Sequence, residues 1–194
     1  MVIQAIRNSS AWDHAVSLDK HIVKSVPIGH NQQGHMQFET ERTVIGEEVF
    51  QLKYRSDFTK VESLAKSVIA ALQDNKFPKI HVVIPMPASK TRERQPVYEV
   101  AKKVAETLGA FFTQEVLVKI KSTGAMKDLE SYEERVAALA GCFESRDRIN
   151  KGPWNILVID DLYDTGASLE AACTELRKYT NIANISVVTL TRRH

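Results

Sequence analysis

Two adjacent carboxylates follow a short apolar run in the last quarter of the chain. Four apolar residues begin at Ile156, Asp160 and Asp161 come directly after them, and a turn of small residues at 164–168 leads into an amphipathic segment. Gly166 allows the backbone of that turn to approach a ligand closely. The free N–H groups of a helix start attract an anion, and carboxylates accept hydrogen bonds from vicinal hydroxyls. The segment therefore predicts a site for a ribose 5-phosphate.

The same turn has a simpler interpretation, which is a helix cap. Asp164 or Thr165 can accept a hydrogen bond from an N–H group in the first helical turn. Three acids and a Thr-Gly pair within seven residues favour a ligand site over a cap alone. The residues expected to surround the phosphate are Asp164, Thr165, Gly166, Ala167 and Ser168.

The elements around this segment alternate between helices and strands. Hydrophobic periodicity predicts helices over residues 58–72, 96–108 and 131–141 and after 168, and strands over 79–84, 110–118, 155–160 and 185–191. Such alternation implies right-handed crossovers and a parallel sheet with both faces covered. The fold class is therefore α/β, a doubly wound parallel sheet, in which ligands bind beyond the carboxyl ends of the strands.

The composition of the chain changes near residue 55. Residues 1–55 form an irregular, polar segment with a loop at 30–35, and residues 56–194 form the core. Within the core, Thr59 with Glu62 predicts a capping box, and Ser131 with Glu134 predicts a second one.

Composition and charge exclude several classes of protein. The 194 residues carry 26 basic and 24 acidic side chains, so a net charge of +2 does not suit a protein that coats nucleic acid. No apolar run approaches the length of a membrane span. Polar residues interrupt the N-terminus too early for a signal peptide, and the two cysteines, Cys142 and Cys173, lack metal-ligand spacing. We expect a cytoplasmic protein without a membrane partner.

Residues 156–169 resemble the phosphoribosyl-pyrophosphate (PRPP) motif of the type I phosphoribosyltransferases. Further segments resemble the ComF-like branch, which is related to the amidophosphoribosyltransferases. Its "LKY" segment, its "PVP" loop with trailing arginines and its "eR…gaF" stretch correspond to residues 52–55, to 84–87 with 92–95, and to 134–135 with 141–143. The similarity spans residues 45–192.

This resemblance implies a transferase that uses PRPP and Mg²⁺. Asp160 and Asp161 would hold the ribose hydroxyls and the metal, and the turn after them the 5-phosphate. The pyrophosphate would lie against a loop that carries Ser89, Lys90 and Arg92, although a solvated basic turn is the simpler interpretation of those residues. Residues 119–130, beginning with Lys119, would close as a lid, and residues 1–55 would form a hood over the acceptor.

Asp164 is the third catalytic residue that the resemblance implies, beside Asp160 and Asp161. Most ComF-like proteins have threonine at this position, whereas the hypoxanthine-guanine branch has an acid that faces the purine. A carboxylate there would take a proton from a nitrogenous acceptor. The competing interpretation is that Asp164 only favours the helix start.

The sequence also departs from its relatives. It contains neither the four-cysteine zinc module of ComF-like proteins nor a glutaminase domain, so glutamine-driven amine transfer is not expected. The main hypothesis is an enzyme that transfers ribose 5-phosphate to a small nitrogenous acceptor and releases pyrophosphate. The alternative is a non-catalytic PRPP or nucleotide sensor, or a partner in DNA uptake, with nucleic acid suggested only by the ComF analogy. The acceptor stays open, and a homodimer is compatible with the sequence.

Overall fold

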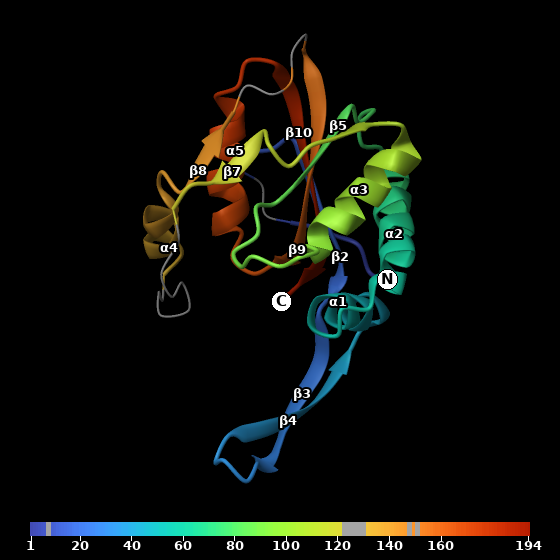
Figure 1. The fold of residues 1–194 in the computed structure, drawn as a ribbon, viewed down its shortest axis with the longest axis vertical. Helices are drawn as coiled ribbons and strands as arrows, with labels where there is room; N and C mark the ends of the chain where they lie inside the picture. Colours follow the sequence, from blue (N-terminus) through green and yellow to red (C-terminus); the bar gives the residue numbers. More distant parts are fainter. Residues whose placement is uncertain (7–8, 122–130, 147–148, 150–151) are drawn as a thin grey trace.

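The computed structural model describes residues 1–6, 9–121, 131–146, 149 and 152–194. A sheet of six strands lies at its centre (Figure 1), in the order β1-β2-β10-β9-β5-β6. The strands in that order are Gln4–Ala5, His14–Lys20, Ile182–Arg192, Trp154–Tyr163, Val82–Pro85 and Phe111–Phe112. Every neighbouring pair is parallel except β1 with β2.

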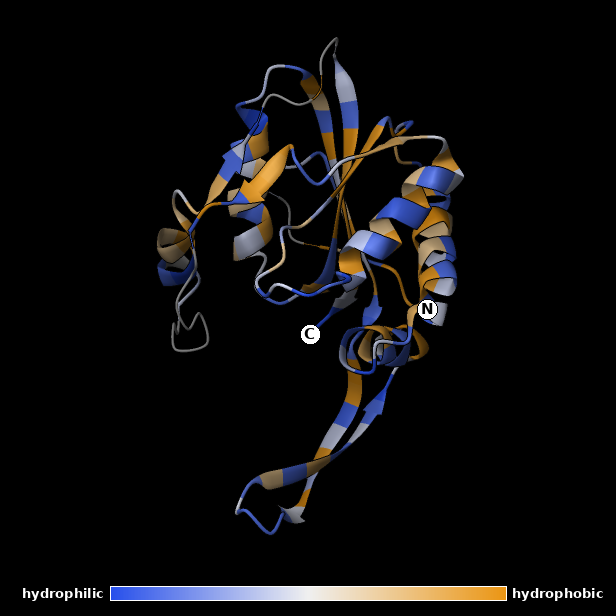
Figure 2. Ribbon diagram, viewed as in Figure 1, coloured by the Kyte–Doolittle hydropathy of each residue, from blue (hydrophilic) through white to orange (hydrophobic). Residues whose placement is uncertain are grey.

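Helices cover both faces of this sheet. Helices α2 (Val61–Asp74) and α3 (Pro96–Leu108) pack on one face, and α5 (Ala167–Arg177) packs on the other. A strand buried on both faces needs a continuous apolar run, and the four residues 156–159 of β9 are fully buried. Figure 2 shows the hydrophobic residues concentrated in the central strands. The predicted α/β class, with a doubly wound parallel sheet, is confirmed.

Both predicted ends of one helix and the predicted start of another are confirmed, and one predicted start is wrong. Helix α3 begins at Pro96 and ends at Leu108, and Gly109, which has a left-handed φ of 64°, caps it. Helix α4 (Tyr132–Leu139) begins with the predicted capping box of Ser131 and Glu134. The box predicted at residues 59–62 is wrong, because Asp57 accepts from the backbone there and opens a short 3₁₀ helix, η1 (Phe58–Lys60).

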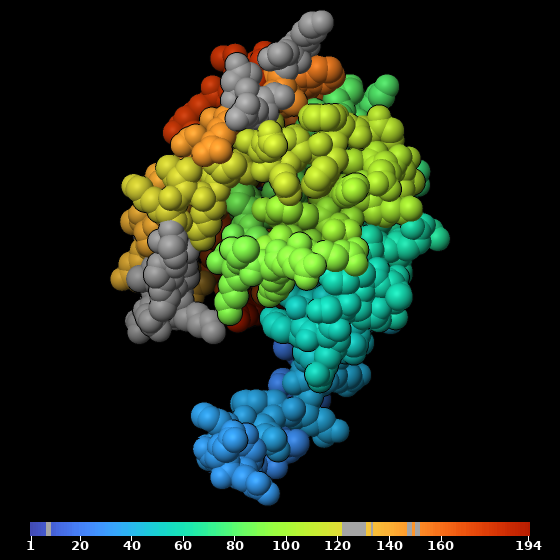
Figure 3. Space-filling view, viewed as in Figure 1, coloured from blue at the N-terminus to red at the C-terminus, as the bar shows by residue number. Residues whose placement is uncertain are grey.

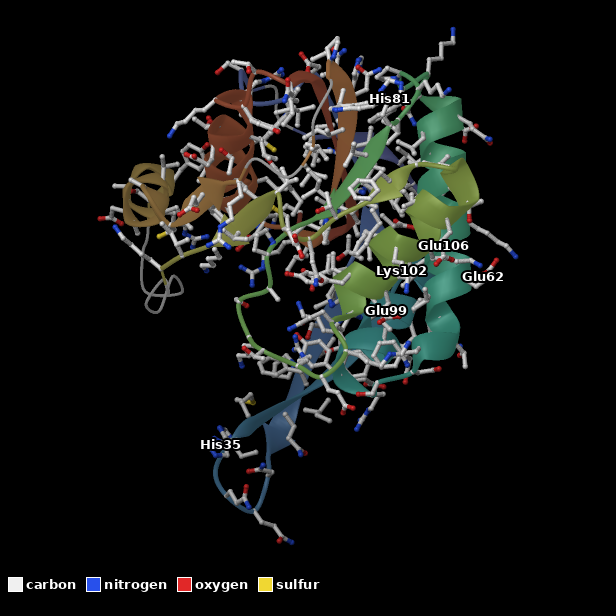
Figure 4. All side chains as sticks on the ribbon, turned by 45° about the horizontal axis from the view of Figure 1, so that its top comes forward. His35, Glu62, His81, Glu99, Lys102 and Glu106 are labelled. Atoms are coloured by element: carbon white, nitrogen blue, oxygen red, sulfur yellow. The ribbon has the colours of Figure 1, made fainter. Side chains whose placement is uncertain are left out.

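The acid of that wrong box joins two helices instead. Glu62 lies 2.9 Å from the Lys103 ammonium, which ties α2 to α3, and Figure 4 labels Glu62 on α2 and Glu106 on α3. The strand predicted over residues 110–118 is also two separate strands. Strand β6 ends at Phe112, and β7 (Leu117–Lys119) pairs instead with β8 (Phe143–Ser145) in a small antiparallel sheet.

The first 55 residues are more regular than predicted. Strand β2 joins the central sheet beside β10, β3 (Ile22–His30) and β4 (Met36–Arg42) form a hairpin, and α1 (Val44–Tyr54) follows. The hairpin projects from the body of the molecule (Figures 1 and 3), and its turn falls at the predicted loop. Strand β2 belongs to the same central sheet as the strands of the core. The sheet therefore includes residues on both sides of the predicted boundary at residue 55.

The hairpin and α1 lie at the same edge of the sheet as the acid pair. Strands β2, β10 and β9 are parallel, so their carboxyl ends meet at one edge, and the hairpin leaves from the end of β2.

Among the described residues, no helix is both long and apolar enough to span a bilayer.

Candidate functional site

Strand β9 continues through the acid pair. Asp160 pairs with Thr189 of β10, and the pairing extends to Tyr163, so both acids belong to the strand and are partly buried. Successive strand residues alternate between faces, yet the backbone N–H of Asp161 donates to Oδ1 of Asp160 at 2.8 Å. This bond holds the Asp160 carboxylate beside the backbone of Asp161.

Both acids line a cavity at that edge. Its walls come from the end of α1, the segment between β5 and α3, the end of β7, the start of β8 and the first turn of α5. The space-filling view shows a hollow between the green segment near residue 90 and the yellow β7 (Figure 3). Of the predicted residues, the structure brings together Ser89, Arg92, Lys119, Asp160, Asp161 and Ser168 in this cavity.

The two acids differ in their electrostatic surroundings. Burial, reinforced by the neighbouring Asp161 charge, raises the pKa of Asp160 to about 7. Asp161 forms an ion pair with Lys53 of α1. Burial alone would lower the pKa of Lys53, but the Asp161 carboxylate, with smaller contributions from Tyr54 and Asp160, raises that pKa above its usual value. Lys53 therefore stays charged.

The raised pKa of Asp160 predicts a pH dependence of stability. A carboxyl that is harder to ionise in the folded chain than in the unfolded chain stabilises the fold while it is protonated. The free energy of unfolding should therefore contain a contribution that is complete below about pH 4 and is lost as the pH rises through about 7. Thermal melts of the metal-free chain from pH 4 to 8 measure it. Asp160→Asn should flatten the profile, and an unchanged profile would contradict the assignment.

The loop between β5 and α3 is braced on both sides. The backbone N–H of Ala88 donates to the Tyr98 hydroxyl at 3.3 Å, and the Gln95 side-chain amide donates to the carbonyl of Lys90 at 2.7 Å. Arg94 stacks over the Phe58 ring at 3.8 Å, away from the cavity. Of the predicted residues in this loop, Ser89 and Arg92 line the cavity, whereas Lys90 does not.

The turn after β9 requires its glycine. Gly166 has a φ of 84°, and a Cβ atom there would lie 2.8 Å from the Tyr163 ring. The Thr165 hydroxyl accepts weakly from the Ala167 N–H at 3.4 Å, so the capping interpretation also has a contact behind it. Ser168, in the first turn of α5, is exposed and lines the cavity; Thr165, Gly166 and Ala167 do not line it.

Asp164 does not face this cavity. Its carboxylate lies 2.9 Å from Arg193 and 3.4 Å from Arg135 of α4, in a separate cluster at the end of the chain. The expectation of a base directed at the acceptor is therefore not met by this geometry, because two guanidinium groups hold the carboxylate. No pattern in the sequence points to Arg193, whereas Arg135 and Lys53 belong to segments that resemble the ComF-like branch but show no role by their spacing.

The residues at the acid pair fit a magnesium ion in part. Mg²⁺ prefers carboxylate oxygens and usually keeps waters and substrate oxygens as further ligands. Asp160 and Asp161 offer such oxygens, and a cation beside them would keep Asp160 ionised. No group of three or more His, Cys, Asp or Glu side chains in the described part of the chain forms a complete protein cage.

The lid predicted over residues 119–130 lies mostly outside the described residues, since these omit 122–130.

A covered parallel sheet, with an acid pair at its carboxyl edge and a glycine turn that opens the next helix, is the arrangement expected from the resemblance to the type I phosphoribosyltransferases. The sequence is 30% identical over 155 residues to the competence protein ComFC of Bacillus subtilis. The match covers 79% of this chain and 62% of that relative's length. The predicted similarity to the ComF-like branch is thereby confirmed. No protein-family model matches the sequence.

Two solved structures match part or most of the chain at low sequence identity. Adenine phosphoribosyltransferase from Saccharomyces cerevisiae matches with a TM-score of 0.46 and 16% identity, over 87% of this chain and 82% of its own. The glutamine PRPP amidotransferase of B. subtilis matches with a TM-score of 0.48 and 16% identity, over 82% of this chain and 34% of its own.

Proposed function

We propose that the protein binds PRPP with Mg²⁺ and transfers its ribose 5-phosphate to a small nitrogenous acceptor with release of pyrophosphate. The observation that carries this proposal is the convergence of acid pair, helix start and basic loop on one cavity. These three features match the three chemical parts of PRPP, namely the ribose hydroxyls, the 5-phosphate and the pyrophosphate.

Each wall of the cavity then has a role toward one part of the ligand. Asp160 and Asp161 accept hydrogen bonds from the ribose hydroxyls and hold the Mg²⁺, which supplies charge neutralisation for the pyrophosphate. Ser168 and the backbone at the start of α5 bind the 5-phosphate. Ser89 and Arg92 contact the pyrophosphate, and Lys119 adds positive charge from the side of β7.

A second candidate is a module that binds PRPP without transferring it. The ion cluster of Asp164 with Arg135 and Arg193 favours this candidate, since it leaves that carboxylate unsuited to act as a base. A screen for pyrophosphate release with nucleobases, ammonia and small amines separates the two. Release with one acceptor supports the enzyme, and PRPP binding without any release supports the sensor.

PRPP with Mg²⁺ is expected to raise the melting temperature of the protein. A ligand at a hundredfold its dissociation constant adds about 2.7 kcal/mol to the free energy of unfolding. For a chain of this size, that corresponds to about 5–10 °C. Differential scanning fluorimetry and calorimetric titration measure the effect, with ribose alone as the control. If neither PRPP nor any ribose 5-phosphate nucleotide binds, the proposed function is wrong.

A further inference from the structure

Lys53 is held at the cavity by the way α1 packs. Thr43 caps the helix by accepting from the N–H of Gly46 at 3.0 Å. A Cβ atom at Gly46 would lie 2.1 Å from the carbonyl oxygen of His21, so α1 rests directly on the chain that leaves β2. Leu52 is buried and anchors the last turn. The next residue, Lys53, is thereby directed at the carboxyl edge of the sheet.

Lys53 pairs with the carboxylate of Asp161, whose oxygens are also the ligands that a divalent cation would use. Lys53 contacts the Asp161 carboxylate, and the two side chains are only 26% and 18% exposed. A divalent cation at the acid pair would place a second positive charge beside this ammonium group. Two cations that close together repel each other strongly where water is largely excluded. Lys53 and a divalent cation therefore compete for Asp161.

The cavity offers Lys53 an alternative partner when an anion enters. Lys53 lines the cavity together with Ser89 and Arg92, so an anion between them lies within the same small space. The ammonium of a lysine has three donors on a flexible stem and can exchange a carboxylate for a phosphate oxygen. That exchange frees Asp161 for the cation. Each ligand then improves the binding of the other, by the same factor in both directions.

We propose that Lys53 is a positioning residue that makes divalent-cation binding at the acid pair depend on a diphosphate-bearing anion in the cavity. The proposal rests on the proposed function and deepens it. It assigns the coupling between metal binding and ligand binding to Lys53 of α1, a residue outside the predicted core. Without the anion, Lys53 takes the place of the metal as counter-ion of Asp161. With the anion, Lys53 binds the diphosphate and the cation binds the acids.

Calorimetric titration with Mn²⁺, alone and with saturating inorganic pyrophosphate at corrected free concentrations, tests the coupling. In the unaltered chain, pyrophosphate should tighten Mn²⁺ binding by about tenfold or more. Lys53→Gln should bind Mn²⁺ alone about tenfold more tightly, and pyrophosphate should then tighten Mn²⁺ binding by a clearly smaller factor than in the unaltered chain, because only the direct attraction between anion and cation is left. Lys53→Arg keeps the charge and should keep the coupling. The matched control is Lys66→Gln, which removes an exposed lysine of α2 that pairs with Glu62 outside the cavity.

The possible outcomes separate this proposal from the proposed function. Equal affinity of the unaltered chain and Lys53→Gln for Mn²⁺ alone, or unchanged coupling in that variant, overturns the role of Lys53 and leaves the site intact. Absence of Mn²⁺ binding in every variant, with and without pyrophosphate, overturns both. If circular dichroism shows that Lys53→Gln does not fold, the unaltered chain and Lys53→Arg still decide, since loss of coupling in either contradicts the proposal.

Discussion

Replacement of both acids of the pair by asparagine is expected to weaken the binding of PRPP with Mg²⁺ by at least about 10²-fold. Asparagine keeps the shape of Asp160 and Asp161 but removes the charge that faces the ribose hydroxyls and the metal. Two effects on stability oppose each other, because the variant removes a charge that is costly to bury while Lys53 loses its carboxylate partner. Calorimetric titration gives the loss of affinity, and thermal melts give the change in stability.

The control for this variant is Glu106→Gln, which changes an exposed acid on α3 (Figure 4) outside the cavity. It should bind PRPP like the unaltered chain. A double asparagine variant that melts at the original temperature and still binds PRPP normally would remove the acid pair from the site. A variant that fails to fold would assign the pair a structural role, and the single changes would then be compared.

Much of the fold is predictable because the hydrophobic residues of each core segment follow one clear pattern, either helical or strand-like. Buried parallel strands need continuous apolar runs, so β9 stands out in the sequence, and the glycine turn after it marks the start of α5. Gly109 and Pro96 mark the ends of α3 for equally local reasons. The acid pair and its turn are local as well, which is why the centre of the site could be found from one stretch of sequence.

The N-terminal part could not be predicted in the same way. Strand β2 is recognisable only through its pairing with β10, which lies more than 160 residues further along the chain. All of β3 and most of β4 are exposed, so the hairpin shows no alternating pattern of burial. Lys53 belongs to a helix with a modest apolar face, and its ion pair with Asp161 depends on how that helix packs.

For Asp164, a local motif leads to a role that the tertiary structure does not support. Its place in the turn led to the expectation of a catalytic base, by resemblance to the hypoxanthine-guanine branch, but its ion partners come from α4 and from Arg193. Arg135 and Arg193 are 29 residues away on either side, so no spacing rule connects them with the turn. The role of a carboxylate is decided by its ion partners, and these are tertiary contacts.

A carboxylate at position 168 is expected to separate phosphate binding from helix stability. Ser168→Asp places a negative charge at the helix start, where the proposal places the 5-phosphate. Like charges about 4 Å apart cost about 4 kcal/mol at an effective dielectric constant of about 20, so PRPP binding should weaken by at least about 10²-fold. The same carboxylate favours the first turn of α5 by about 0.3–1 kcal/mol, so the melting temperature should stay equal or rise.

Two further variants make this result specific to the cavity. Ser168→Ala removes only a hydroxyl and should weaken PRPP binding by about tenfold or less, which corresponds to a single neutral hydrogen bond. Ser63→Asp makes the same change in the first turn of α2, at an exposed position outside the cavity, and should leave binding unchanged. Titration of each variant with PRPP and Mg²⁺ gives the three affinities. If Ser168→Asp binds PRPP as tightly as Ser63→Asp, the first turn of α5 is a helix start and not a phosphate site.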